Sequence, residues 1–222
     1  MTRTKVLLSW SSGKDAAWAL HALRQAGDVD VVGLLTTTNE AFGRVAMHAV
    51  RESLLEAQAE AVGLPLWKVP LPWPCPNEAY EARMAEACAS AVAEGIGAMA
   101  FGDLFLEDVR DYRIQKLAGT GLAPLFPIWD PDTVGLSRAM VAAGLKATLT
   151  CVDPRALDAA FAGRAFDAGL LADLPAGVDP CGERGEFHTF AWDGPMFSHP
   201  VAVRNGEVIE RDGFVFADLV PA

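Results

Sequence analysis

The chain has 222 residues, a length that suits one large domain or two small ones and that buries most of its apolar surface without a disulfide or a metal. Apolar residues make up 51% of the sequence and charged residues 21%, which excludes a wholly disordered chain. The 18 basic and 29 acidic residues give a net charge of -11. Since nucleic-acid phosphates are bound by clustered Lys and Arg, this balance argues against a nucleic-acid partner.

The cysteines and the apolar runs indicate where the protein resides. The four cysteines show no C-x-x-C spacing, so they predict neither a zinc ribbon nor a thioredoxin-like site. The apolar run at 6–10 is too short for a signal-peptide core, and no run approaches the ~18 residues of a membrane span. We therefore expect a cytoplasmic protein with reduced thiols and no membrane partner.

Short apolar runs alternate with longer helical segments in the first 127 residues. We predict strands at 6–10, 31–35, 66–69, 98–101 and 123–126. We predict helices at 16–26, 46–62, 78–94 (with Asn77 as N-cap) and 107–118. Strands that alternate with helices form right-handed βαβ units, so the fold class is α/β, with a doubly wound, parallel, five-stranded sheet in a domain at 1–127.

The pattern changes after residue 127 and predicts a smaller α+β domain at 128–222. We predict helical segments at 133–143 and 155–174, the latter broken at Gly163. We predict strands at 147–152, 186–192, 200–203, 208–210 and 214–217. Asn205-Gly206 is a strong two-residue hairpin signal between two of these strands.

The sharpest local pattern lies where the first predicted strand ends. There L-L-S-W-S-S-G-K-D-A, at 7–16, passes from a strand through a Ser/Gly loop into a helix. A helix N-terminus presents unpaired N–H groups and a partial positive charge, and Lys14 adds a formal charge. The pattern predicts a phosphate site, although it is neither a Walker loop nor a dinucleotide fingerprint. An ordinary strand-to-helix turn stays open as the alternative.

Two further polar segments lie near predicted strands. Asp103 follows the fourth strand and can hold Mg²⁺, and the helix that follows places two arginines on one face. The segment D-P-C-G-E-R-G-E-F-H-T-F, at 179–190, offers Glu183 and Glu186 as general bases or cation ligands and His188 for proton transfer. The alternatives are a solvated helix face and a Gly-rich turn with a core histidine.

The three segments together carry a family resemblance. S-S-G-K-D-A, at 11–16, resembles the S-G-G-K-D-S loop of PP-loop ATP pyrophosphatases, with Ser12 replacing a glycine and Ala16 a serine. With G-D-L-F-L-E-D-V-R-D-Y-R at 102–113 and C-G-E-R-G-E-F-H-T-F at 181–190, the chain resembles the diphthine–ammonia ligase family of that superfamily. Arg184 stands where the family usually has a glycine.

The resemblance implies an adenine nucleotide alpha hydrolase-like fold of the Rossmann-like kind. It implies ATP and Mg²⁺ as cofactors, and a reaction in which a carboxylate is adenylated and then joined to ammonia, with AMP and pyrophosphate as products. The carboxylate partner is small or carried on a protein, as diphthine is. The implied catalytic residues are Lys14, Asp103, Glu107, Arg110, Glu183, Glu186 and His188. The implied nucleotide contacts are Ser9, Ser11, Ser12, Gly13, Lys14, Asp15, Thr36, His48 and Gly102, with Asp15 and Asp103 as metal ligands. The implied substrate contacts are Arg113, Gly185 and Thr189.

Three alternatives stay open beside this hypothesis. The changes at Ser12 and Ala16 suit a nucleotide-binding sensor without turnover. Arg outnumbers Lys 13 to 5, which is typical of a GC-rich bacterial genome and favours a small acid over diphthine. Transfer-RNA modification is disfavoured by the acidic balance and the missing cysteine pairs. The sequence does not define the oligomeric state, and a homodimer is kept as a hypothesis.

Overall fold

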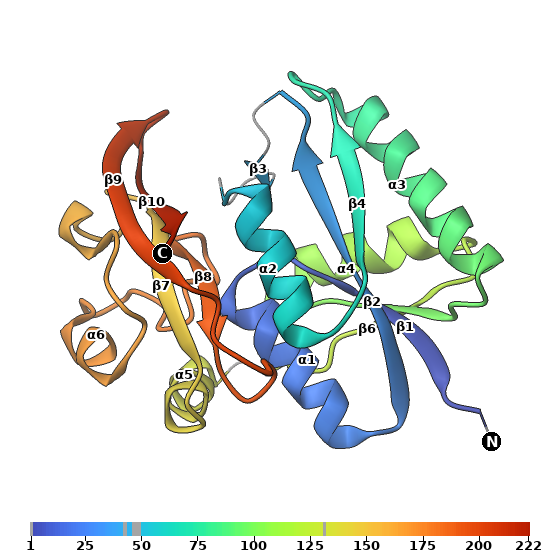
Figure 1. Cartoon of the computed structure of the whole chain (residues 1–222), viewed down its shortest axis with the longest axis horizontal. Helices are drawn as coiled ribbons and strands as arrows, with labels where there is room; N and C mark the ends of the chain where they lie inside the picture. The colour runs from blue at the N-terminus through green and yellow to red at the C-terminus, as the bar shows by residue number, and fades with distance from the viewer. Residues whose placement is uncertain (1, 42–43, 46–49, 131) are drawn as a thin grey trace.

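A parallel sheet fills the first half of the chain in the computed structural model, and an antiparallel sheet fills the second half (Figure 1). The structure describes residues 2–41, 44–45, 50–130 and 132–222. Both the mostly parallel sheet and the smaller α+β part were predicted from the sequence, and the fold class is confirmed.

The first sheet has the strand order β4-β2-β1-β5-β6, and these five strands are parallel. A short sixth strand, β3, pairs antiparallel with the end of β2 and was not predicted. The strands are β1 (Thr4–Ser9), β2 (Val29–Asn39), β3 (Arg44–Val45), β4 (Leu66–Leu71), β5 (Ala98–Ala100) and β6 (Ala123–Leu125).

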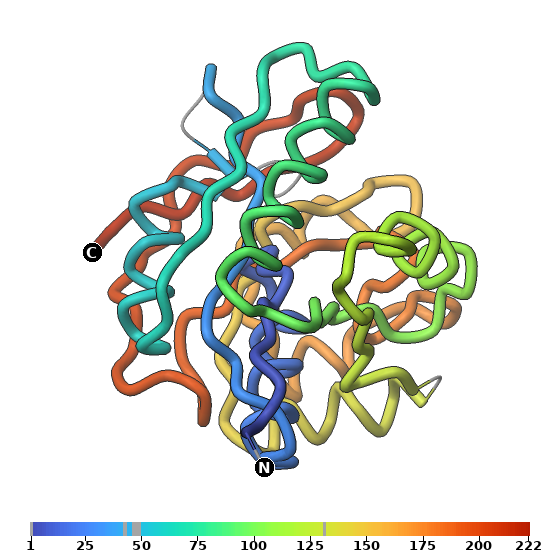
Figure 2. Tube along the Cα trace, turned by 90° about the vertical axis from the view of Figure 1, so that its right-hand side faces the viewer, coloured from blue at the N-terminus to red at the C-terminus, as the bar shows by residue number. Residues whose placement is uncertain are grey.

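Helices cover both faces of this sheet. The helices are α1 (Lys14–Ala26), α2 (Glu52–Val62), α3 (Asn77–Ala93) and α4 (Glu107–Leu117). Val6 and Leu8 of β1 pack in one core with α1 and α2, whereas Leu7 packs in the other core with α3 and α4. This burial on both sides explains why β1 is a continuous apolar run. Figure 2 shows α3, in green, crossing in front of the blue strands.

Two predicted helix starts need comment. Asn77 is the first residue of α3, and the helix is capped by Pro76 without a side-chain hydrogen bond, so the N-cap prediction was wrong by one position. The helix predicted at 46–62 is observed from Glu52, and residues 46–49 lie outside the described residues. Among the described helices, none is long and apolar enough to cross a membrane.

The second half of the chain builds an antiparallel sheet of order β8-β7-β10-β9. Its strands are β7 (Lys146–Val152), β8 (Phe187–Asp193), β9 (Val203–Arg211) and β10 (Phe214–Pro221). The helices of this part are α5 (Thr133–Ala142), the 3₁₀ turn η1 (Ala159–Phe161) and α6 (Ala168–Asp173).

One prediction for this half was wrong, and another is confirmed only in part. Asn205 and Gly206 lie inside β9, and the hairpin turns instead at Asp212-Gly213, where both residues have positive φ. The helical region predicted at 155–174 is observed as η1 and α6, which flank the predicted break at Gly163, and the residues between them contact the sheet. Gly163 donates to the carbonyl of Leu149, and Phe166 donates to that of Ala147, both in β7.

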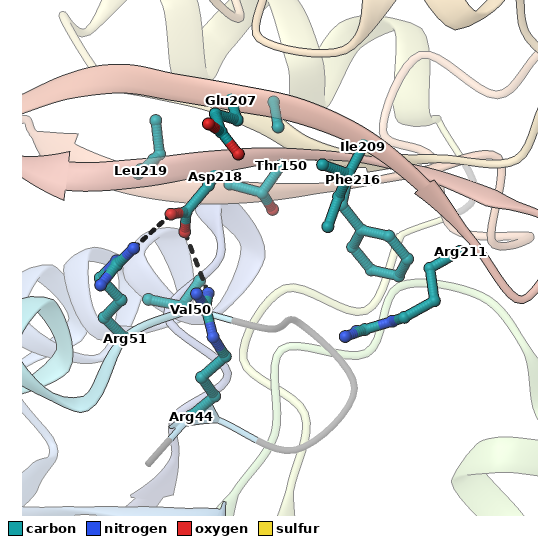
Figure 3. Close-up of a pocket in the computed structure, with 11 residues that line it drawn as sticks. Arg44, Val50, Arg51, Thr150, Glu207, Ile209, Arg211, Phe216, Asp218 and Leu219 are labelled. Carbon is teal, nitrogen blue, oxygen red and sulfur yellow. Dashed lines mark hydrogen bonds and ion pairs between the residues drawn. The ribbon is translucent and has the colours of Figure 1, made fainter. Parts of the chain in front are cut away.

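The two halves are joined by hydrogen bonds and by ion pairs. The amide of Ala191 in β8 donates to the carbonyl of Ser12, which follows β1. On the opposite side of the contact, Arg44 and Arg51 both bind the carboxylate of Asp218 in β10, at 3.0 and 2.5 Å (Figure 3). The antiparallel sheet is thereby held beside the loop that follows β1, and this places its residues at the candidate site.

Candidate functional site

The loop after β1 turns sharply into α1. Ser12 has φ 70°, in the left-handed region that favours glycine, and its side chain is fully buried. Among the described residues its hydroxyl has no hydrogen-bond partner. The backbone of Gly102 closes the other side, because a Cβ there would lie 2.9 Å from the carbonyl carbon of Asp15. The loop and the first turn of α1 border a cavity beyond the end of β1.

Two residues outside the motif hold this loop. Gln58 of α2 is fully buried; its amide nitrogen donates to the carbonyls of Ser12 (2.9 Å) and Ala191, and its oxygen accepts from Trp10 Nε1. Thr189 of β8 accepts a hydrogen bond from the amide of Lys14 at 3.1 Å, so it caps α1 from the other half of the chain. Gln58 was not predicted; the available signal was a lone polar residue on the apolar face of a helix.

Lys14 is a buried cation that links the two halves. Its ammonium group donates to both oxygens of Asp15, at 3.0 and 2.8 Å, and to the carbonyl of Cys181. It also lies 5.5 and 5.4 Å from the ring centres of Phe166 and Phe187. Burial acts to lower the pKa of Lys14, but the nearby carboxylates outweigh burial and raise it. The ammonium group therefore stays charged at neutral pH.

A polar cavity of about 250 Å³ lies over this loop, between the ends of the parallel strands and the segment at 181–189. Twelve of the predicted site residues line it: Ser9, Ser11, Gly13, Lys14, Asp15, Gly102, Asp103, Arg113, Glu183, Gly185, His188 and Thr189. Phe101, Cys181 and Phe187 also line it and were not predicted. The three sequence motifs thus meet around one space.

The carboxyl groups and the imidazole of this cavity are perturbed by burial. Burial raises the pKa of Glu183 to about 7, although the amide of Leu104 donates to its carboxylate at 2.9 Å. Burial likewise raises the pKa of Asp103, against the effect of Arg113. Burial and then Lys14 lower the pKa of His188. At neutral pH the cavity holds a neutral imidazole and one carboxyl group that readily gains or loses a proton.

Six predicted residues do not line this cavity, and one of them, Thr36, lines the adjoining cavity instead. Glu107 and Arg110 are exposed on α4, and the guanidinium of Arg110 lies over the rings of Phe126 and Trp129. Glu186 is buried, and it accepts hydrogen bonds from the amides of Asp179 and Arg184, which fixes the turn between them. Ser12 is buried beneath the loop. His48 lies outside the described residues, so its prediction stays a prediction.

A second cavity of about 440 Å³ adjoins the first and is more apolar. Thr36 of β2, a predicted nucleotide contact, lines it. The other walls include the unpredicted Trp10, Leu35, Val45, Trp73 and Tyr80. Ser9, Ser11, Phe101 and Arg113 border both cavities, so the two form one continuous site with a polar and an apolar part.

The predicted metal ligands are held by cations in this structure. Asp15 binds Lys14, and Asp103 lies 3.4 Å from Nε of Arg113. Within the described part of the chain, no group of three or more His, Cys, Asp or Glu residues forms a metal cage. The residues nevertheless suit Mg²⁺ bound together with phosphates, because Mg²⁺ commonly takes one or two carboxylates and completes its shell with phosphate oxygens and water.

In nucleotide-binding α/β proteins the ligand lies at the carboxyl ends of the strands, where a loop leads into a helix N-terminus, and the polar cavity of this chain has that location. Residues 4–120 match the family described as the diphthamide synthase N-terminal domain, and residues 132–216 match its C-terminal domain. The chain belongs to the diphthine–ammonia ligase family of PP-loop ATP pyrophosphatases.

Individual relatives agree with this assignment. The diphthine–ammonia ligases of Homo sapiens and Mus musculus are 29% and 30% identical to the chain over 120 residues, which is 51% of this chain and 45% of each relative. The diphthine–ammonia ligase of Schizosaccharomyces pombe is 32% identical over 95 residues, which is 41% of this chain and 16% of that relative. The matched stretch therefore spans less than half of these curated relatives.

Proposed function

We propose that the protein is an AMP-forming ligase that activates a carboxylate with ATP and transfers ammonia to it. The observation that carries the proposal is the convergence of Lys14, Asp103, Glu183 and His188 from three separate motifs on one polar cavity. The names of the relatives, diphthine–ammonia ligases, support the same reaction class. The four free cysteines in the described residues suit the reducing cytoplasm that we propose as its location.

The two cavities suit the two ends of ATP. The triphosphate would lie on the loop N–H groups above Lys14, and the base would lie in the apolar part beyond β2. The α-phosphate would then sit where the cavities meet, next to Ser9, Ser11 and Arg113. Mg²⁺ held by Asp103 or Asp15 would supply further positive charge to the phosphate oxygens.

The reaction proceeds in two steps. A carboxylate oxygen attacks the α-phosphorus, the bond to the bridging oxygen of the β-phosphate breaks, and pyrophosphate leaves. Ammonia then attacks the acyl carbon, and AMP leaves with the electrons of the broken C–O bond. Glu183 takes the proton that ammonia loses, a role that suits a carboxyl group with a pKa of about 7. Lys14 and the loop N–H groups stabilise the charge on the phosphates.

The test follows ATP labelled at the α-phosphate, with ammonium and a panel of carboxylic acids. We expect AMP and pyrophosphate, and we expect no AMP when ammonium or the acid is left out of multiple-turnover assays. Asp103→Asn and Glu183→Gln should lower the rate by about 100-fold or more. Asp108→Asn, which changes an exposed carboxylate on α4, is the matched control and should keep the rate. ADP as product would contradict the proposal, and bound ATP that never yields AMP would favour a nucleotide sensor.

A further inference from the structure

A third cavity lies between α3 and α4, on the sheet face that these helices cover. Its volume is about 310 Å³, which is in the range of small-molecule sites. The walls are mostly apolar: Met84, Cys88, Met99, Phe101 and Leu117, with the rings of Tyr80 and Tyr112. The other two cavities suffice for ATP, so the acyl substrate of the proposed reaction has no site among them.

Phe101 and Arg113 line all three cavities. The guanidinium of Arg113 lies 4.9 Å from the centre of the Phe101 ring, and its Nε is 3.4 Å from Oδ2 of Asp103. Tyr80 and Met84 separate the third cavity from the apolar part of the nucleotide site, because they line both. The third cavity therefore adjoins the place where the α-phosphate of ATP would lie.

The charges around the third cavity favour an anion. Arg113 and Lys116 are the cations that line it, and its one lining carboxylate, Glu81, accepts a 2.6 Å hydrogen bond from Lys116. The residues that line the cavity thus carry one net positive charge, and Asp103, which pairs with Arg113, borders the polar cavity instead. A guanidinium has five N–H donors, so Arg113 can hold Asp103 and a second carboxylate at once.

We propose that this third cavity binds the acyl substrate, and that the substrate is a carboxylic acid with an apolar body. The body lies among Met84, Met99 and Leu117, and the carboxylate lies on Arg113, at the edge of the polar cavity. The inference rests on the proposed function, which requires an acyl site beside the α-phosphate. Arg113 thereby recognises the carboxylate of the substrate.

The first experiment measures binding without ATP, using 3-phenylpropionate as the probe and 3-phenylpropanol as the neutral control. By calorimetry we expect the acid to bind at least about tenfold more tightly than the alcohol, because a carboxylate on a guanidinium gains charge-assisted hydrogen bonds. Equal binding of the two compounds, or tighter binding of trimethylglycine than of the acid, would overturn the inference.

The second experiment locates the acid by the NMR signals of labelled methionine methyl groups. Met99 lines the third cavity alone, whereas Met84 borders the third cavity and the nucleotide site. Met140 and Met196 are buried elsewhere and serve as internal controls. We expect the acid to shift Met84 and Met99 and to leave the two controls in place. A shift of Met84 without Met99 would place the acid in the nucleotide site and overturn the inference.

A matched pair of variants on α3 completes the test. Ala85 lines the cavity and Ala82 does not, and both are exposed. Ala85→Trp should fill the cavity and reduce binding of the acid at least about tenfold, whereas Ala82→Trp should keep it. Unchanged binding by a folded Ala85→Trp protein would overturn the inference; if that variant does not fold, the methionine shifts decide.

The outcomes separate this inference from the proposed function. Acid binding at Met99, without AMP formation from ATP, acid and ammonium, would support the cavity and contradict the ligase. AMP formation with other carboxylates, together with no binding of the acid, would support the ligase and overturn the cavity assignment.

Discussion

The side chain of Gln58 holds the backbone of Ser12, with Nε2 of Gln58 2.9 Å from the Ser12 carbonyl oxygen. The same nitrogen donates to Ala191 in β8, so one amide joins α2, the loop after β1 and the antiparallel sheet. Ser12 is in a conformation that a serine adopts at an energetic cost. The fully buried Gln58 therefore acts as a brace that keeps the loop in its observed conformation.

We expect Gln58→Leu to destabilise the protein by about 2–4 kcal/mol. Leucine leaves the Trp10 indole N–H without its acceptor and the Ala191 carbonyl without this donor, and such buried unpaired groups are costly. Urea unfolding measures the loss. Gln115→Leu, on the exposed surface of α4, is the control and should stay within about 0.5 kcal/mol of the original protein. Equal stability of the two variants would contradict a bracing role.

Ser12→Gly is expected to stabilise the protein by about 1 kcal/mol. Glycine removes the cost of about 1–2 kcal/mol that a side chain adds to a left-handed backbone conformation. It also removes a buried hydroxyl that has no partner among the described residues. Against these gains, glycine loses about 0.5–1 kcal/mol more backbone entropy on folding. Ser12→Ala removes the hydroxyl but keeps the penalty, so its thermal midpoint should fall between those of the other two proteins. A glycine variant that melts below the original protein would disprove this explanation.

Strand β1 and the hairpin of β9 and β10 show how much of the fold could be predicted from the sequence. The apolar run in the middle of β1 results from burial on both faces, a local property that the sequence itself reveals. The sequence analysis placed the hairpin turn at Asn205-Gly206, but the chain turns at Asp212-Gly213, a pair that suits a two-residue turn equally well. Pairing with β10 selects the second turn, since Phe214 faces Arg211, and no local rule ranks the two.

The same limit applies to the site. Lys14, Asp103 and Glu183 could be predicted to lie near one another because each lies close to the end or the start of a strand, and all three line one cavity. The sequence did not reveal that Lys14 binds the carbonyl of Cys181, because that partner lies 167 positions away. Arg110 shares a helix with Arg113, yet it lies over Phe126 and Trp129. Helical spacing fixes relative direction on one helix but not which direction faces the cavity.

We expect Asp218→Asn to lower the free energy of unfolding by about 1–2 kcal/mol at pH 7, because it breaks the ion pairs with Arg44 and Arg51 (Figure 3). Burial acts to raise the pKa of Asp218, but the two arginines outweigh it and hold the pKa below its ordinary value. The ion pairs therefore stabilise the protein at pH values above the ordinary aspartate pKa. This stabilisation is lost as the pH falls through the lowered pKa of Asp218.

Urea unfolding of the two proteins across the acidic range tests this expectation. The difference between them should shrink toward zero at the acid end. Asp28→Asn, which changes an exposed aspartate between α1 and β2, should show no such difference at any pH. A constant Asp218→Asn effect from pH 7 to the acid end would show that the contact does not depend on the charge.

The carboxyl group of Glu183 should give the protein a pH dependence near neutrality. Its pKa is raised to about 7 by burial, so the folded state holds this proton more tightly than the unfolded chain does. The contribution of Glu183 to stability is therefore fully present below the ordinary glutamate pKa of about 4.5, and it decreases until the pH reaches about 7. Thermal midpoints of Glu183→Gln should be higher relative to the original protein at pH 8 than at pH 5.

The same proton should appear in the rate of AMP formation. As a base, Glu183 must be ionised, so at a constant concentration of free ammonia the rate should rise with pH and level off above about 7. Holding free ammonia constant removes the titration of ammonium itself from the profile. Glu183→Gln should flatten the profile, whereas Asp108→Asn should retain it. A Glu183→Gln variant that keeps both the rate and the inflection near pH 7 would contradict this role of Glu183 and assign the proton to another group.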